Sequence, residues 1–218
     1  MELYLKGIQI ACKGISATVG VSLIALVVGA TFGLLIALAR LSDNKVLRGI
    51  CGVYVDVVRG TPMVVQALIM AYGIPQLLQA NGVMFKWPEL VLPAIIVCGL
   101  NSAAYMAEVI RSGLQAVDKG QMEAARSLGM PKGMAMRLII IPQAVKIILP
   151  AFCNEFVTLI KETAVLSFVG VTEILRRGAL WNSQSFETFP AYIGVAIAYM
   201  ILTIPLSKII GNYEKKNG

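Results

Sequence analysis

Polar side chains interrupt the apolar stretches of this sequence at helical spacing. Asn101, Tyr105 and Glu108 follow an i, i+4, i+7 pattern, so they would share one face of a helix. A later stretch carries two such stripes, which consist of Asn154, Thr158 and Lys161, and of Glu155, Thr158 and Glu162. Ionisable groups inside a membrane are costly and usually face a cavity or a partner. The stripes therefore predict either a polar pathway between helices or contacts that hold helices together.

A third polar set surrounds a break in an apolar stretch. Asp56, Arg59 and Gln66 flank the segment Gly60-Thr61-Pro62, in which the proline removes a backbone donor and kinks or stops a helix. Broken helices in transporters often lie beside the substrate. We interpret this break as a structural feature that shapes a cavity, although a simple kink would explain the same residues.

The charged residues allow a structural and a functional interpretation. In the structural one, Glu108 pairs with Arg111 or Arg59, and Lys161 and Glu162 lie at the outer interface of the membrane. In the functional one, carboxylates such as Glu155 line a polar pathway between helices. Histidine is absent and the four cysteines are far apart, so the residues favour neither a metal site nor a disulfide framework, and we expect four inert, buried thiols.

The elements that position these residues are membrane helices. Of the 218 residues, 57% are apolar and only 14% are charged, whereas soluble domains have about 45–50% and about 25%. A span needs roughly 20 apolar residues, and we predict five spans: Ile15–Leu38, Ile50–Leu78, Pro88–Ile110, Ala144–Ile160 and Tyr192–Ile210. The net charge of +7 does not indicate nucleic acid, because the basic residues adjoin apolar runs.

Lysine and arginine distribute unevenly between the two sides of these spans. They are more numerous on the side that holds residues 112–143, which the positive-inside rule places in the cytoplasm. With five spans, the N-terminus is then outside and the C-terminus is cytoplasmic. The first apolar run is too long for a signal peptide, so we expect a retained first helix.

The loop 112–143 is predicted to be a helical hairpin. The first helix covers Lys119–Leu128, and Gly129 supplies the left-handed position after it. Pro131 suits the first turn of a second helix, which is expected to end at Pro142. Its surface carries adaptable methionines and small alanines, which favours docking onto another protein over a solvated hairpin without a partner.

The hairpin also carries a family motif. Glu123-Ala124-Ala125, then Gly129, Ile139 and Ile141-Pro142, resembles the EAA motif of ABC importer permeases, with Ile141 where leucine is usual. The resemblance implies that this loop is the coupling helix that docks into a groove of an ATPase subunit. It assigns ATPase coupling to Glu123, Ala124, Ala125, Gly129, Ile139 and Pro142.

Three further segments resemble the polar amino acid branch of these permeases, and the likeness covers about residues 10 to 212. They are Arg59-Gly60-Thr61-Pro62 with Val65-Gln66, Ala107-Glu108-Val109-Ile110-Arg111-Ser112-Gly113, and Lys161-Glu162-Thr163 with Leu166-Ser167, where Ala164 replaces a usual serine. A zwitterionic amino acid needs an acceptor for its ammonium and donors for its carboxylate. On that basis we expect the substrate pathway to include Asn101, Tyr105, Glu108, Glu155, Thr158, Arg59 and Gln66. Gate or structural roles fall to Gly60, Thr61, Pro62, Lys161 and Glu162.

The resemblance implies an all-α membrane protein with the five-helix core of a type I ABC importer permease, in a single domain over residues 1–218. It implies a second permease subunit, identical or paralogous, two ABC ATPase subunits, an external solute-binding protein and a bacterial inner membrane with its lipid. The chain has no phosphate-binding loop, so we expect it to be non-catalytic and to bind no cofactor, with ATP and magnesium held by the partner ATPase. Residues 165–175 are expected to form a re-entrant or interfacial helix near the outer gate.

Two other functions remain open from the residues alone. Asp56, Glu108 and Glu155 could carry protons in an ion-coupled secondary transporter, although the hydrophobic pattern shows no internal repeat. A membrane scaffold that recruits a cytosolic protein through residues 112–143 is the other alternative.

Overall fold

The computed structural model describes residues 1–217, with side chains described for residues 1–215, and every regular element in that range is helical. Five segments are long and apolar enough to cross a membrane: Glu2–Leu41, Met63–Ala80, Val91–Gln115, Lys132–Val169 and Thr188–Lys215. The predicted all-α membrane architecture with five spans is therefore confirmed.

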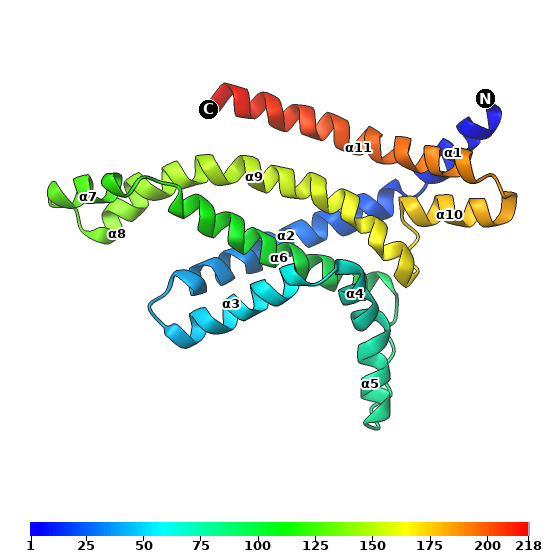
Figure 1. Ribbon diagram of the computed structural model, residues 1–218, viewed down its shortest axis with the longest axis horizontal. Coiled ribbons are helices and arrows are strands. Elements are labelled where there is room, and N and C mark those ends of the chain that lie inside the picture. The colour runs from blue at the N-terminus through cyan, green and yellow to red at the C-terminus, as the bar shows by residue number, and fades with distance from the viewer. Residues whose placement is uncertain (218) are drawn as a thin grey trace.

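The first span consists of two helices, α1 (Glu2–Cys12) and α2 (Ile15–Leu41), which run from the end that carries the N-terminus through the middle of the molecule (Figure 1). Helix α2 packs along α6 (Val91–Gln115). The two helices approach closely because α2 has glycines at the contact. A Cβ on Gly33 would collide with Met106, and one on Gly29 would collide with Ser102. Gly29 and Gly33 are four residues apart, so both lie on the face of α2 that packs against α6.

The second predicted span is divided more sharply than its sequence suggests. Helix α3 (Lys45–Gly60) packs against α2 and α6, and Thr61, which has extended backbone angles, follows its last residue. A short α4 (Met63–Leu68), a π-helical turn (Ile69–Gly73) and α5 (Ile74–Ala80) then leave the bundle in a new direction (Figure 1). The break at Thr61-Pro62 therefore ends one helix and redirects the next.

The fourth segment is continuous from the hairpin into the membrane. It comprises α8 (Lys132–Ala135), a π-helical turn (Met136–Ile140), α9 (Ile141–Glu162) and a 3₁₀ helix (Thr163–Val169). The expectation that the second hairpin helix ends at Pro142 is wrong. The π turn lets the N–H of Ile141 bond to the carbonyl of Met136, and Pro142 then occupies the first turn of α9, where its missing N–H costs little.

The expected helix over residues 165–175 is also wrong. The 3₁₀ helix ends at Gly170, whose φ of 91° is left-handed, and the next helix, α10 (Ile174–Ser185), begins near the end of the expected range. The chain closes with α11 (Thr188–Asn217), which packs on α1 and α9.

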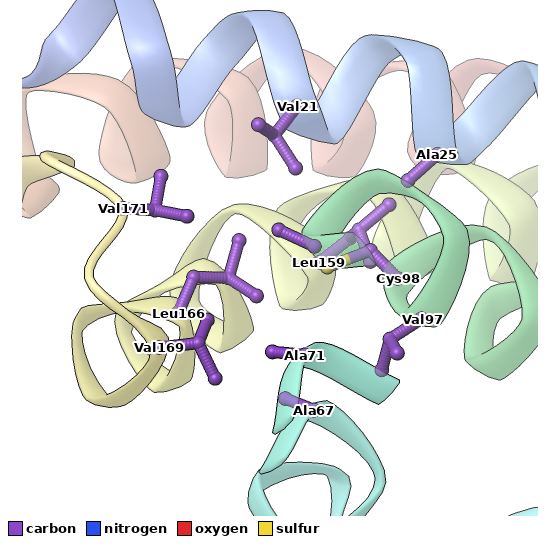
Figure 2. Close-up of a cluster of buried hydrophobic side chains, with 11 residues drawn as sticks. Val21, Ala25, Ala67, Ala71, Val97, Cys98, Leu159, Leu166, Val169 and Val171 are labelled. Carbon is purple, nitrogen blue, oxygen red and sulfur yellow. The ribbon is translucent and has the colours of Figure 1, made fainter. Parts of the chain in front are cut away.

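The main core gathers small and aliphatic side chains from α2, α4, α6, α9 and the 3₁₀ helix. Figure 2 shows Leu159 and Leu166 facing Cys98 of α6 and Ala71 of the π turn. The core therefore lies where the redirected second span meets the central pair of helices. All four cysteines are free, but only Cys98 is buried; the other three are partly exposed, so burial of all four was a wrong expectation.

The α1–α11 contact gives a direct test of this packing. A Cβ on Gly194 would lie 2.6 Å from the carbonyl oxygen of Gly7 and 2.7 Å from the nitrogen of Ile8, so Gly194→Ala must push two backbones apart. We expect the free energy of unfolding to fall by about 1–3 kcal/mol, and the apparent melting temperature in detergent to fall with it. Gly211→Ala on the same helix meets nothing within 4 Å and serves as the control. Equal melting temperatures for both variants would contradict the close contact.

Candidate coupling surface and membrane pathway

The first helix of the hairpin and the corner after it form as their local sequence predicts. Helix α7 (Lys119–Ser127) begins at Asp118, whose carboxylate accepts a hydrogen bond of 2.6 Å from the N–H of Gly120. After α7, Gly129 adopts a φ of 81°, which an L side chain rarely tolerates. Pro131 then caps α8. The corner between the two helices therefore depends on one glycine and one proline.

The outer face of the hairpin is exposed and partly apolar. Leu128 is 84% exposed and Met134 is 50% exposed. Glu123 and Ala124 are also exposed, whereas Ala125 is buried against the rest of the hairpin. We call Glu123, Ala124, Leu128 and Met134 the hairpin face. Exposed leucine, alanine and methionine side chains on one short hairpin are typical of a protein-contact surface.

Two further motif residues lie in the helical segment that follows α8. Ile139 is partly buried and packs with Met136 and Leu114 against buried Ile140 and Ala144. Pro142 is exposed at the start of α9. Sequence reasoning singled out Glu123 and the two alanines but missed Leu128, although its place just before Gly129 would have shown it to be at the tip.

The break in the second span is held by Gln66. Its side-chain N–H groups donate to the carbonyl oxygen of Val58 at 2.8 Å and to the hydroxyl of Thr61 at 2.9 Å. Both acceptors lie at the end of α3, where the last carbonyl groups of a helix have no N–H group of a following turn to bond to. Gln66 thus supplies a hydrogen-bond donor to the carbonyl end of α3, in addition to its predicted place in the substrate pathway. Its sequence position did not reveal this structural role.

The break also brings the second and third spans together. The side-chain oxygen of Gln66 accepts a hydrogen bond of 3.3 Å from the amide of buried Asn101. One helical turn further along α6, the guanidinium of Arg59 lies 5.2 Å from the ring centre of Tyr105, within the range of a cation–π contact. Four of the predicted pathway residues are therefore neighbours.

Glu155 of α9 adds a carboxylate to this group of residues. It is half-buried and interacts with the charges of Arg59 and Glu162. Its neighbours on α9 differ: the hydroxyl of Thr158 bonds to the carbonyl of Asn154, and Lys161 is exposed. We call Arg59, Gln66, Asn101, Tyr105 and Glu155 the pathway cluster. It offers a cation, a carboxylate, two amides and an aromatic face from four different helices, α3, α4, α6 and α9.

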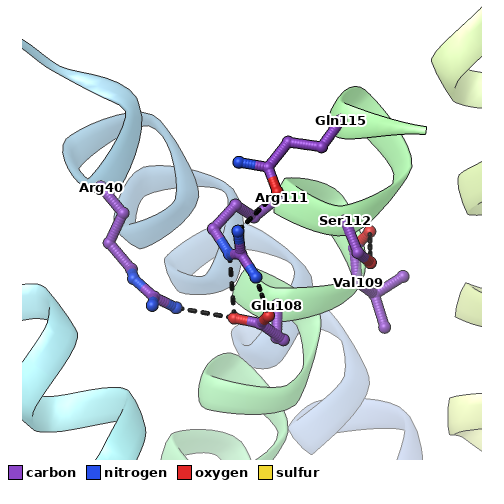
Figure 3. Close-up of polar contacts among 6 residues, drawn as sticks. All are labelled: Arg40, Glu108, Val109, Arg111, Ser112 and Gln115. Carbon is purple, nitrogen blue, oxygen red and sulfur yellow. Dashed lines mark hydrogen bonds and ion pairs between the residues drawn. The ribbon is translucent and has the colours of Figure 1, made fainter. Parts of the chain in front are cut away.

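Glu108 has a separate set of partners (Figure 3). Its carboxylate accepts from Arg40 of α2 at 2.7 Å and pairs with Arg111 on its own helix. Arg111 also donates to the side chain of Gln115 at 2.6 Å. Of the two partners that the sequence suggested, Arg111 is confirmed and Arg59 is wrong, since Arg59 contacts Tyr105 instead. Arg40 was missed because the contact joins residues 68 positions apart.

A buried polar cluster at the opposite end of the bundle was also missed. Glu173, only 1% exposed, caps α10 through the N–H groups of Leu175 and Arg176 and accepts a hydrogen bond of 2.7 Å from the hydroxyl of Tyr199. The hydroxyl of buried Thr18 accepts from the N–H of Ile174 at 3.4 Å. These contacts tie α10 to the membrane helices α2 and α11.

Comparison with known proteins agrees with these features. The chain is 35% identical to the arginine transport system permease protein ArtQ of Bacillus subtilis, over 94% of this chain and 90% of that one. It is 37% identical to the candidate glutamine transport permease GlnP of Rickettsia prowazekii, over 98% and 95%.

Solved structures show the same fold. The structure of an amino acid ABC transporter with histidines superposes with a TM-score of 0.88 at 38% identity, covering 97% of this chain and 96% of that one. The MetNI methionine ABC transporter shares the fold alone, with a TM-score of 0.70 at 18% identity over 100% and 97% of the chains. Residues 29–217 match the family described as the inner membrane component of binding-protein-dependent transport systems. The chain is therefore a member of this family of multi-pass membrane permeases.

Proposed function

We propose that this chain is the membrane-spanning permease subunit of an ATP-driven importer of polar amino acids. The observation that carries the proposal is the hairpin face, an exposed and partly apolar surface at the end of two spans in a chain of this family. Two ATPase subunits bind ATP and magnesium and dock on the hairpins of two permease subunits, and an external binding protein delivers the substrate. The hairpin and the C-terminus then lie in the cytoplasm, and the N-terminus lies outside.

Polar amino acids are the proposed substrates for two reasons. The relatives with matched length include permeases named for arginine and glutamine. The pathway cluster offers matching chemistry, because Glu155 can accept from an ammonium and Arg59 can donate to a carboxylate. We propose that the translocation path passes this cluster, with the break at Gly60, Thr61 and Pro62 shaping its wall and Lys161 and Glu162 near its outer end.

The continuity of the fourth segment supplies the mechanical link. Because α8, the π turn and α9 form one helical rod from Lys132 to Glu162, a displacement of the hairpin is transmitted along the rod to Glu155. ATP binding draws the two hairpins together and opens the path outward, and hydrolysis returns it to face inward. This subunit performs no covalent chemistry in such a cycle.

The proposal is tested by reconstituting the chain in vesicles with its ATPase and binding protein. Uptake of radiolabelled arginine, glutamine, histidine and glutamate is measured with and without ATP, together with hydrolysis. We expect uptake of at least one of them that requires ATP and stimulates hydrolysis. Uptake that persists without ATP and follows a proton or sodium gradient would replace the proposal with an ion-coupled transporter, and ATPase binding without any uptake would favour a scaffold.

A further inference from the structure

A pocket lies at the end of α6 opposite the hairpin, and neither the hairpin face nor the pathway cluster includes it. One wall is the stretch from the first π turn into α5, and the other is the loop 81–90, which returns beside α5 to the start of α6 (Figure 1). Its volume is about 600 Å³, within the range of roughly 300–1,000 Å³ for ligand sites. We call it the outer pocket, and its lining includes Tyr72, Gln76, Gln79, Lys86, Trp87 and Glu89.

Backbone contacts hold the aromatic part of this lining in place. The indole N–H of Trp87 donates to the carbonyl oxygen of Met70 at 2.9 Å, and the hydroxyl of Tyr72 donates to that of Val169 at 3.2 Å. The ring of Phe85 packs edge-on against Trp87, with the ring centres 4.9 Å apart. Met70 and Tyr72 both belong to the π turn, and π turns are rare but frequent at functional sites. The outer pocket therefore has a fixed aromatic wall.

The charged and amide side chains of the outer pocket are free to contact a ligand. Lys86 and Glu89 both line it, and within residues 1–215 neither forms a salt bridge or a side-chain hydrogen bond. The side-chain amides of Gln76 and Gln79 on α5 likewise have no partner in that range. All four side chains are exposed. The pocket thus presents one cation, one carboxylate and two amides beside its aromatic wall.

We propose that the outer pocket binds a free α-amino acid, with its carboxylate at Lys86 and its ammonium at Glu89. A zwitterion needs a cationic donor and an anionic acceptor in one cavity, and such charge-assisted hydrogen bonds are the stronger kind. The two glutamines suit a polar side chain, because an amide both donates and accepts. A phosphate or a metal ion is a less suitable ligand, since either would be repelled by one of the two charges.

The outer pocket and the pathway cluster lie along one stretch of chain. Gln76 of the pocket is ten residues after Gln66 of the cluster, and helix α4, the π turn and α5 join them, which corresponds to about 15 Å. An amino acid that arrives from the outside would meet the outer pocket before the cluster. This order of the two sites rests on the proposed function, whereas binding at Lys86 and Glu89 does not.

Binding can be followed through Trp87 in the full chain, placed in nanodiscs without ATPase or binding protein. The chain has two tryptophans, and the other, Trp181, is only 8% exposed on α10 and outside the lining. We expect L-arginine and L-glutamine to change the tryptophan emission saturably in the wild type and in Trp181→Phe, but not in Trp87→Phe. Agmatine and 4-aminobutanamide, which lack the carboxylate of these amino acids, should bind about tenfold more weakly.

The two charges are tested with Lys86→Met and Glu89→Gln, each of which should weaken binding of L-glutamine about tenfold. Lys45→Met, at the exposed start of α3, is the control and should bind as the wild type does. Equilibrium dialysis with radiolabelled glutamine repeats the comparison without relying on fluorescence. Equal binding by the wild type, Lys86→Met and Glu89→Gln in dialysis would overturn the proposal. ATP-dependent uptake together with that result would overturn only this site and leave the proposed transport function standing.

Discussion

Leu128→Asp is expected to uncouple the chain from its ATPase. Leu128 is 84% exposed at the tip of the hairpin, so the substitution should cost little folding free energy. In the proposed complex this side chain enters a pocket of the ATPase, and a central apolar contact of that kind contributes about 2 kcal/mol or more. We expect binding to be at least about 30-fold weaker, and ATP-driven uptake to be lost, as measured by co-purification and by uptake into vesicles.

The control introduces the same charge at an equally exposed apolar residue. Met84 is 87% exposed in the loop after α5, far along the chain from the hairpin. Met84→Asp should leave co-purification with the ATPase unchanged. Glu123→Arg, on the same face as Leu128, should weaken it. Wild-type binding by Leu128→Asp and Glu123→Arg would place the ATPase contact elsewhere.

The hairpin shows what a sequence can predict, because its signals are local. The position after α7 needs a left-handed residue, and Gly129 supplies it; the next helix starts where Pro131 allows it. The predicted stop at Pro142 failed for an equally local reason. A proline interrupts an α-helix, but a preceding π turn removes the conflict, and residue types alone do not indicate where such a turn forms.

The pathway cluster and Glu108 show what local sequence patterns cannot predict. Helical spacing placed Asn101 and Tyr105 on one face, and the structure brings Gln66 and Arg59 to that face. Spacing could not choose between Arg59 and Arg40 as the partner of Glu108, because the choice depends on how α2, α3 and α6 pack. The helical period predicts which residues share a face of one helix, whereas their partners on other helices depend on tertiary packing.

Glu173 is the clearest residue that sequence reasoning missed. It lies at the start of a helix, where Ser, Thr, Asp and Asn are the usual caps, so its residue type did not single it out. Its burial, and its hydrogen bond from Tyr199 on another helix, depend on α10 and α11 packing together over α1 and α2. The sequence therefore shows that Glu173 precedes a helix but not that it is buried, and its burial determines how much it contributes to stability.

Glu173→Ala should consequently be among the most destabilising substitutions in the chain. It removes the cap of α10, worth about 1 kcal/mol, and leaves the hydroxyl of Tyr199 without its acceptor, which costs about 1–3 kcal/mol. The sum of about 2–4 kcal/mol corresponds to a fall of about 5–15 °C in apparent melting temperature for a chain of this size. Asn44→Ala is the matched control, because Asn44 caps α3 through the same two kinds of backbone N–H but is exposed. Equal losses for both variants would show that burial and Tyr199 add nothing to the cap.

The same carboxylate predicts how stability changes with pH. Burial raises the pKa of Glu173, and the hydrogen bonds from Tyr199, Leu175 and Arg176 oppose that rise only in part. Between the unfolded pKa, near 4.5, and the raised folded pKa, the folded chain holds a proton that the unfolded chain has lost. The contribution of Glu173 to stability must therefore fall as pH rises through this window and stay lower above it. Glu173→Gln lacks the titration but keeps an acceptor for Tyr199, so the melting temperature of the wild type should fall relative to Glu173→Gln as pH rises from 4.5. A constant difference between the two across this range would mean that the hydrogen bonds fully offset the cost of burial.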